Sequence, residues 1–112
     1  MNDYQTAALR TAAPKDKKDE VFHLVLGLCG ESGEIAEKVK KIVRDHGSDF
    51  SHLSKDDLTK ELGDVLWYVA VLADHFDIPL GDVADKNIQL MEASGATSKE
   101  VRKLKNQMYA LL

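Results

Sequence analysis

Two pairs of acidic residues have the spacing that could hold a metal ion. Glu31 and Glu34 are three residues apart, and so are Glu61 and Asp64. Residues at i and i+3 share one face of an α-helix, and each pair falls along the edge of an apolar stripe. If the two helices pack antiparallel, four carboxylates can converge, and they would repel one another unless a cation lay between them. Their hard oxygen atoms suit Mg²⁺ or Mn²⁺ rather than zinc.

A solvated helix face is the alternative interpretation of these pairs. The chain is 30% charged, so acidic i,i+3 pairs also arise by chance on exposed faces. Like charges at this spacing mildly destabilise a surface helix, which favours a role for two matching pairs. Spacing alone leaves both interpretations open.

Five helices are expected to position these residues, and no strand is predicted. Apolar residues at helical spacing predict the two long helices that carry the acidic pairs. Their stripes contain Val21, Val25, Leu28, Ile35, Val39 and Ile42 in one helix, and Leu58, Leu62, Val65, Val69, Leu72 and Phe76 in the other. The five predicted helices span about Asp3 to Ala12, Asp19 to Asp45, Lys55 to His75, Leu80 to Ala93 and Thr97 to Leu111. The fold class is therefore predicted to be an all-α antiparallel helical bundle.

Local signals mark several helix ends. Gly47 can end the second helix, and the segment from Ser54 to Asp57 resembles a capping box that starts the third. Pro79 suits the first turn of the fourth helix. Thr97 to Glu100 is a second capping box, and the charged stretch from Lys15 to Asp19 is expected to be a solvated turn or a helix entry.

Three glycines in the second helix allow another interpretation. The apolar run 21–26 is followed by Gly27, Gly30 and Gly33, as in a strand that leads into a phosphate-binding loop. Their spacing is GxxGxxG instead of GxGxxG, and no Gly-Lys-Ser/Thr follows. Each glycine costs about 1 kcal/mol relative to alanine inside a helix. Three together indicate points where another backbone or a ligand comes close.

Composition limits the possible protein classes. The 112 residues suit a single domain, here taken as 1–112, with 44% apolar residues for a core. The net charge of −4 argues against a nucleic-acid partner. A single cysteine excludes an intramolecular disulfide and a cysteine-based zinc cluster. Because neither a signal peptide nor an apolar run of membrane-spanning length is apparent, we expect a cytoplasmic protein without a membrane partner.

The acidic pairs lie within longer motifs that resemble a known family. The segments GLCGESGEIAE (27–37) and ELGDVLWY (61–68), with Lys40 and Lys41 between them, are similar to the MazG-like all-α nucleoside triphosphate pyrophosphohydrolases. That family's signature is ExxE, a spacer and ExxD. The resemblance covers about residues 4–88, so the helix predicted at 97–111 is additional.

The resemblance implies an enzyme that cleaves nucleoside triphosphates to the monophosphate and pyrophosphate. It implies that Glu31, Glu34, Glu61 and Asp64 are Mg²⁺ ligands, with Glu31 or Glu34 as the catalytic base. Substrates related to dUTP, dCTP or phosphoribosyl-ATP are alternatives within the same class. Lys38, on the same flank, is expected to pair with Glu34.

Four further residues are candidates for substrate binding. Lys40 and Lys41 match basic residues of the family, which implies contact with phosphate, although they also suit the negative end of a helix. Asn87 matches a family position near the nucleotide. Tyr68 shares the flank of Glu61 and Asp64, where it could line a nucleotide pocket or simply pack in a core or an interface.

Two features raise further questions about assembly and activity. Trp67 points away from the main stripe of its helix, and an exposed tryptophan favours a subunit interface in a homodimer or homotetramer. After Asn87 the family usually carries a lysine and an arginine, but this chain continues as IQLMEASG. That departure favours a competing hypothesis, a non-catalytic metal-binding module for oligomerisation or regulation, whereas the complete set of four carboxylates opposes it.

Overall fold

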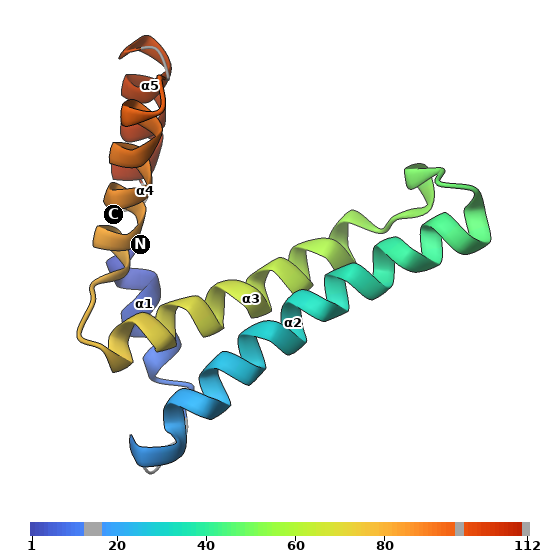
Figure 1. Ribbon diagram of the computed structural model, residues 1–112, viewed down its shortest axis with the longest axis horizontal. Helices are drawn as coiled ribbons and strands as arrows, with labels where there is room; N and C mark the ends of the chain where they lie inside the picture. The colour runs from blue at the N-terminus through green and yellow to red at the C-terminus, as the bar shows by residue number, and fades with distance from the viewer. Residues whose placement is uncertain (13–16, 96–97, 111–112) are drawn as a thin grey trace. The chain divides into compact units, whose positions relative to one another are not determined.

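The protein is all-α, as predicted. The computed structural model describes residues 1–12, 17–95 and 98–110, and in this part of the chain every regular element is helical (Figure 1). The elements, in chain order, are α1 (Asn2–Leu9), α2 (Lys17–His46), the 3₁₀ helix η1 (Phe50–His52), α3 (Lys55–His75), α4 (Leu80–Ala93) and α5 (Ser98–Tyr109).

The predicted helices match the observed ones closely. The bounds of α3 and α4 are those predicted, and α2 differs from its prediction by two residues at its start and one at its end. The alternative interpretation of 21–26 as a strand, which the glycine spacing disfavoured, is wrong, because this run lies inside α2 as predicted. The predicted first helix ends too late, since α1 stops at Leu9. Residues 13–16 and Thr97, on which the charged linker and the last capping box partly depend, lie outside the described residues.

Contacts divide the chain into two compact units, which are described separately. One unit contains α2, η1 and most of α3, up to Leu72. The other contains α1 and the chain from Ala73 onward.

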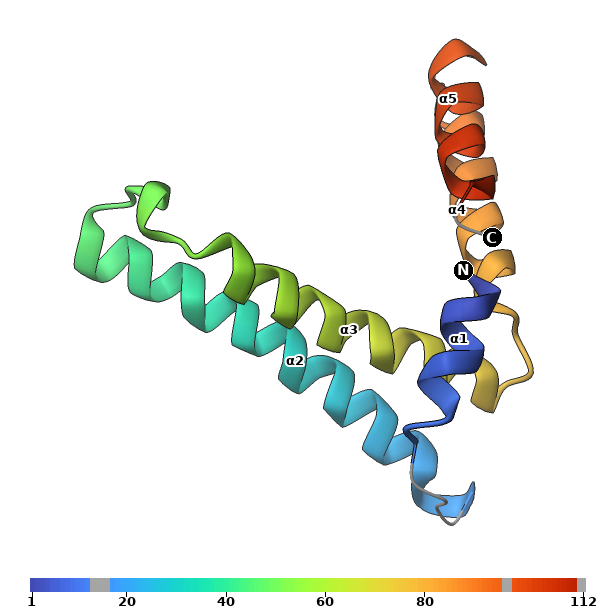
Figure 2. The ribbon, with the colours of Figure 1, turned by 180° about the vertical axis from the view of Figure 1, so that it is seen from behind.

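In the first unit, α2 and α3 run side by side and antiparallel, as both views show (Figures 1 and 2). Gly47 follows α2 with a positive φ of 55°, as the predicted cap requires. η1 then packs against the end of α2 through the stacked rings of His46 and His52. The Ser54 hydroxyl accepts a hydrogen bond from the Asp57 backbone N–H, which confirms the predicted cap of α3.

The apolar stripes of α2 and α3 are only partly buried. Leu24, Ile42, Ala70 and Val71 are buried, and of these four only Ile42 belongs to the predicted stripes. By contrast, several residues of the predicted stripes are exposed, namely Val25, Val39, Leu62 and Phe76. Two helices can cover only a part of each other's circumference, so a wide stripe remains accessible on such a pair. Trp67, predicted to be exposed, is half-buried and meets the Tyr68 ring edge-on.

In the second unit, side chains of α1 cap the start of α4. Pro79 precedes α4 and offers no side-chain cap. Instead, the Gln5 side chain accepts a hydrogen bond from the Leu80 backbone N–H, and the Asn2 side chain accepts one from that of Gly81. The free N–H groups of a helix start are thereby satisfied by another helix.

Packing of α4 against α5 completes this unit. Leu80, Ile88 and Val101 are buried, and Lys105 forms an ion pair of 2.8 Å with Glu92. Across the described residues, none of the helices combines the length and the apolar character that a membrane crossing needs.

Candidate functional site

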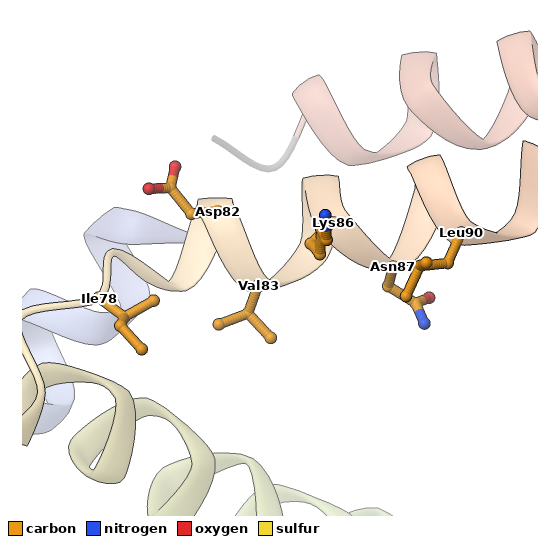
Figure 3. Close-up of a pocket in the computed structure, with 6 residues that line it drawn as sticks. All are labelled: Ile78, Asp82, Val83, Lys86, Asn87 and Leu90. Carbon is orange, nitrogen blue, oxygen red and sulfur yellow. The ribbon is translucent and has the colours of Figure 1, made fainter.

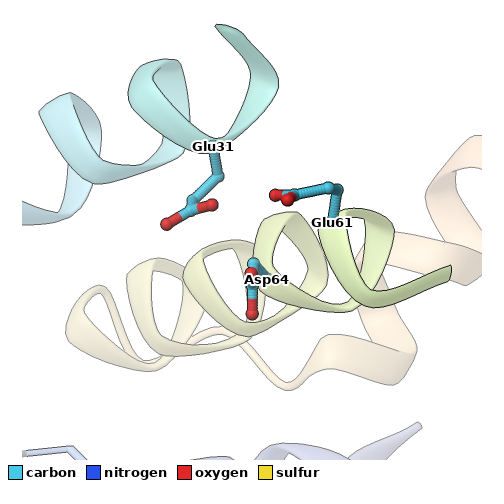
Figure 4. A group of neighbouring side chains, drawn as sticks. All are labelled: Glu31, Glu61 and Asp64. Carbon is cyan, nitrogen blue, oxygen red and sulfur yellow. The ribbon is translucent and has the colours of Figure 1, made fainter. Parts of the chain in front are cut away.

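Three carboxylates from two helices meet in the α2–α3 unit. Glu31 comes from α2, and Glu61 and Asp64 come from α3. One oxygen from each side chain lies within 4.8 Å of the other two. Figure 4 shows the carboxylates of Glu31 and Glu61 directed toward one another across the gap between the helices. We call these three residues the acidic cluster.

Burial and mutual repulsion make the acidic cluster electrostatically unfavourable by itself. Glu61 is only 9% exposed, and Glu31 and Asp64 are half-buried. Desolvation raises the pKa of Glu31 above its ordinary value, and the negative charges of Asp64, Glu61 and Glu34 raise it further. Lys60 acts weakly in the opposite direction. A bound cation would relieve this repulsion.

The donor set of the acidic cluster fits a hard divalent cation. All three ligands offered are carboxylate oxygens, which Mg²⁺ and Mn²⁺ prefer over the nitrogen and sulfur ligands of zinc sites. The oxygens are close enough for one ion to be shared among them, and they come from rigid helical segments. The residues present therefore fit the predicted metal.

Glu34 is placed differently from the other three predicted ligands. It lies one turn beyond Glu31 on α2, is exposed, and is not part of the group of mutually close oxygens. It is still near enough for its charge to raise the pKa of Glu31. The structure thus separates the four acids into a close group of three and one neighbour that faces solvent.

Lys38 bridges the two helices, and its predicted partner was wrong. Its Nζ lies 3.8 Å from Oε1 of Glu61 on α3, whereas the sequence suggested an ion pair with Glu34 on the same helix. A local rule of i,i+4 spacing could not find this contact, because it depends on how α2 and α3 are aligned. Lys38 supplies the positive charge that partly balances the most buried carboxylate.

The predicted phosphate-binding lysines lie on the exposed surface of α2. Lys40 forms a loose ion pair of 4.0 Å with Glu37, and both side chains are well exposed. Lys41 is exposed as well. Among the described contacts, none joins either lysine to the acidic cluster.

Tyr68 packs against α2 at the position of a glycine. Its ring lies so close to Gly27 that a Cβ atom added there would be 2.8 Å from Cδ1 and nearer still to two other ring carbons. The glycine spacing had indicated such a close approach, but not its partner. Tyr68 is half-buried, so packing accounts for at least part of its role.

Asn87 lines an open pocket in the other unit. The pocket has a volume of about 440 Å³ and is formed by residues of α4 together with Ile78, which lies just before this helix. Its lining residues are Ile78, Asp82, Val83, Lys86, Asn87 and Leu90. Figure 3 shows Ile78, Val83 and Asn87 projecting from the same side of this segment. The pocket therefore combines apolar side chains with the Asn87 amide and the charged side chains of Asp82 and Lys86.

Comparison with known proteins gives the family. The model of the MazG nucleotide pyrophosphohydrolase domain matches residues 20–93, which include the acidic cluster and Asn87. The chain is also 42% identical over 95 residues to the "Gene 37 protein" of Mycobacterium phage L5, an alignment that covers 80% of this chain and 83% of that protein. No solved structure matches significantly. On the domain match and this relative, the chain belongs to the MazG nucleotide pyrophosphohydrolase domain family.

Proposed function

We propose that the chain is a Mg²⁺-dependent nucleoside triphosphate pyrophosphohydrolase, which converts a (deoxy)nucleoside triphosphate and water to the monophosphate and pyrophosphate. The observation that carries this proposal is the acidic cluster, in which three carboxylates from two helices converge with one lysine nearby. Membership of the family supports the reaction class.

The proposed metal ligands are Glu31, Glu61 and Asp64, with Glu34 completing the set from the next turn of α2. Mg²⁺ is the expected ion, and Mn²⁺ is a chemically similar substitute. When bound, such an ion neutralises phosphate charge and favours ionisation of water.

The carboxylates of α2 are the candidates for the catalytic base. The water oxygen bonds to the α-phosphorus, the bond from that phosphorus to the α–β bridging oxygen breaks, and pyrophosphate leaves with the electron pair. Glu31 or Glu34 accepts the proton of the water at a carboxylate oxygen. Glu34 is exposed, so water has access to its carboxylate.

Substrate binding is proposed for Lys40, Lys41, Tyr68 and Asn87. The exposed lysines can attract the triphosphate by charge. The pocket at Asn87 offers apolar walls to the faces of a nucleobase and an amide to its polar edge. Tyr68 offers an aromatic ring on α3, the helix that also carries Glu61 and Asp64 of the acidic cluster.

We also propose a homodimer or homotetramer, acting in the cytoplasm. The supporting observation is apolar exposure on α2 and α3: Phe22 and Leu26 are 68% and 69% exposed, and Leu62 is exposed on the other helix. A second copy of the α2–α3 pair would cover such a stripe by helix-on-helix packing. Trp67 is half-buried, so it does not supply the exposed aromatic surface that was expected for this interface.

A non-catalytic regulatory module is the second candidate. One specific feature favours it, the absence of the family's lysine and arginine after Asn87. Lys86 in the pocket and the basic residues of α5 are possible replacements within the enzyme hypothesis. Substrates of the dUTP, dCTP or phosphoribosyl-ATP type remain alternatives for the enzyme.

A nucleotide panel tests the proposal directly. The protein is incubated with Mg²⁺ and each of the common ribo- and deoxynucleoside triphosphates, and monophosphate and pyrophosphate are measured. We expect turnover of at least one nucleotide, with loss of activity on chelation and in Asp64→Asn. Asp57→Asn, a change of the same kind on α3 but outside the acidic cluster, is the matched control and should retain turnover.

Two outcomes would contradict the proposal in different ways. Metal binding without product from any nucleotide would favour the regulatory module. Release of orthophosphate without pyrophosphate would mean that a different bond is cleaved.

A further inference from the structure

One glycine of α2 differs from the other glycines near the acidic cluster. A side chain at Gly27 would collide with the Tyr68 ring, whereas a Cβ atom added at Gly30, Gly33 or Gly63 would meet nothing within 4 Å. All four glycines lie in helices, where glycine is a poor choice by intrinsic propensity. Gly27 alone among them is explained by a neighbour in the same chain.

The contact lies one helical turn from the acidic cluster on both helices. Glu31 follows Gly27 by four residues on α2, and Asp64 precedes Tyr68 by four residues on α3. Because α2 and α3 are antiparallel, one turn forward along α2 corresponds to one turn backward along α3 (Figure 1). The Gly27–Tyr68 contact and the Glu31–Asp64 approach are therefore consecutive layers of the same helix pair.

The ring can lie this close to α2 only because Gly27 has no side chain. A Cβ atom at position 27 would have to push the aromatic ring away, and a ring held by its neighbours moves together with its helix. Trp67 meets the same ring edge-on, with ring centroids 5.0 Å apart, which limits its freedom. The distance between α2 and α3 at the Gly27–Tyr68 contact consequently sets their distance at the next layer, where the carboxylates of the acidic cluster must meet.

We propose that Gly27 and Tyr68 are positioning residues for the metal site, and that their contact sets the distance and alignment of Glu31 relative to Glu61 and Asp64. The inference rests on the proposed function, because it assumes that the acidic cluster binds the metal. It assigns Tyr68 a role through its ring and its packing, in addition to any contact with substrate. Neither residue touches the metal in this role.

Mn²⁺ binding in the absence of nucleotide is the direct test. Affinity is measured by electron paramagnetic resonance for the full chain, together with thermal unfolding of each variant. We expect Gly27→Ala to weaken Mn²⁺ binding by at least tenfold. Gly30→Ala and Gly63→Ala are matched controls, one on each helix, because the same methyl group meets open space there. Their affinity should stay within about twofold of wild type, with equal or higher thermal stability because alanine is the better helix former.

A double variant separates the contact from a general defect in folding. Tyr68→Ala removes the ring, so Gly27→Ala should cause no further loss of affinity in that background. Tyr68→Phe keeps the ring and should keep Mn²⁺ affinity, which separates packing from the phenolic hydroxyl. If Gly27→Ala weakens binding equally with and without the Tyr68 ring, the contact is not the cause and the inference is wrong.

The result also separates this inference from the proposed function. Normal Mn²⁺ binding by wild type and by Gly27→Ala overturns the positioning role alone. Absence of Mn²⁺ binding by the wild-type protein overturns the metal site of the proposed function, and the positioning role with it.

Discussion

Gln5 and Glu61 are both buried polar residues, one in each unit, but their surroundings are opposite. Gln5 is 7% exposed, donates a hydrogen bond to the Ile78 carbonyl and accepts one from the Leu80 backbone N–H. Glu61 is 9% exposed and faces two other carboxylates, with Lys38 at 3.8 Å as its positive partner.

This difference distinguishes a structural polar group from a candidate metal ligand. A buried amide whose donor and acceptor are both used stabilises the local fold and has no need of a ligand. A buried carboxylate among carboxylates is left with unfavourable charge that a ligand can relieve. The α1–α4 junction is thus complete by itself, whereas the acidic cluster keeps a charge repulsion that a cation would relieve.

The largest expected effect is the loss of activity in Glu61→Gln. Removing the central carboxylate should lower the turnover number by at least about 100-fold, because the cation loses a ligand and the site loses a negative charge. Thermal unfolding of the metal-free protein should be unchanged or shifted upward, since the change also removes repulsion. A large loss of stability together with full activity would reverse the functional assignment of Glu61.

The second effect concerns the satisfied residue, Gln5. Gln5→Ala should lower the free energy of unfolding by about 1–3 kcal/mol, because the buried Leu80 N–H loses its acceptor. Urea unfolding measures this change. Thr6→Ala is the control on the same helix, since its exposed hydroxyl donates a hydrogen bond to the Asn2 carbonyl within α1. Equal losses of unfolding free energy for the two variants would show that the capping of α4 by Gln5 adds no more stability than an exposed side-chain hydrogen bond does.

The third effect is a pH dependence with opposite signs for metal-free stability and metal binding. The pKa of Glu31 is raised in the folded state, so between its ordinary value of 4.5 and the raised value the folded protein binds more protons than the unfolded one. Metal-free stability should therefore fall as pH rises through this window. Urea unfolding at several pH values should show this slope in wild type, and Glu31→Gln should lack it.

Metal affinity should respond in the reverse direction. Binding requires the ionised carboxylate, so Mg²⁺ or Mn²⁺ affinity should fall by up to about tenfold per pH unit below the raised pKa of Glu31. Titration calorimetry at several pH values measures it. An affinity independent of pH across this range would exclude Glu31 as a ligand.

The smallest effect is expected from Lys38→Met. The lysine is partly exposed and its contact with Glu61 is long, so the change in unfolding free energy should stay below about 1 kcal/mol. Mn²⁺ affinity should rise a few-fold, because a positive charge that competes with the cation is removed. A marked fall in affinity would instead mean that Lys38 holds Glu61 in its binding position.

Sequence alone determined the helices and the residues that could carry chemistry. The ends of α3 and α4 follow from local signals, such as the Ser54 cap and the break before Pro79, which act over a few residues. The two acidic pairs follow from helical spacing in the same way, and the family signature adds their expected role. These features need no knowledge of which helix lies beside which.

Tertiary structure decided which of those residues meet. Spacing of i,i+3 places Glu31 and Glu34 on one flank, but the rotation and alignment of α2 against α3 bring only Glu31 into the acidic cluster. The same alignment gives Lys38 a partner on α3 and places the Tyr68 ring over Gly27. Such contacts depend on packing between residues some 20 to 40 positions apart, and a local pattern contains no information about the azimuth at which two helices meet.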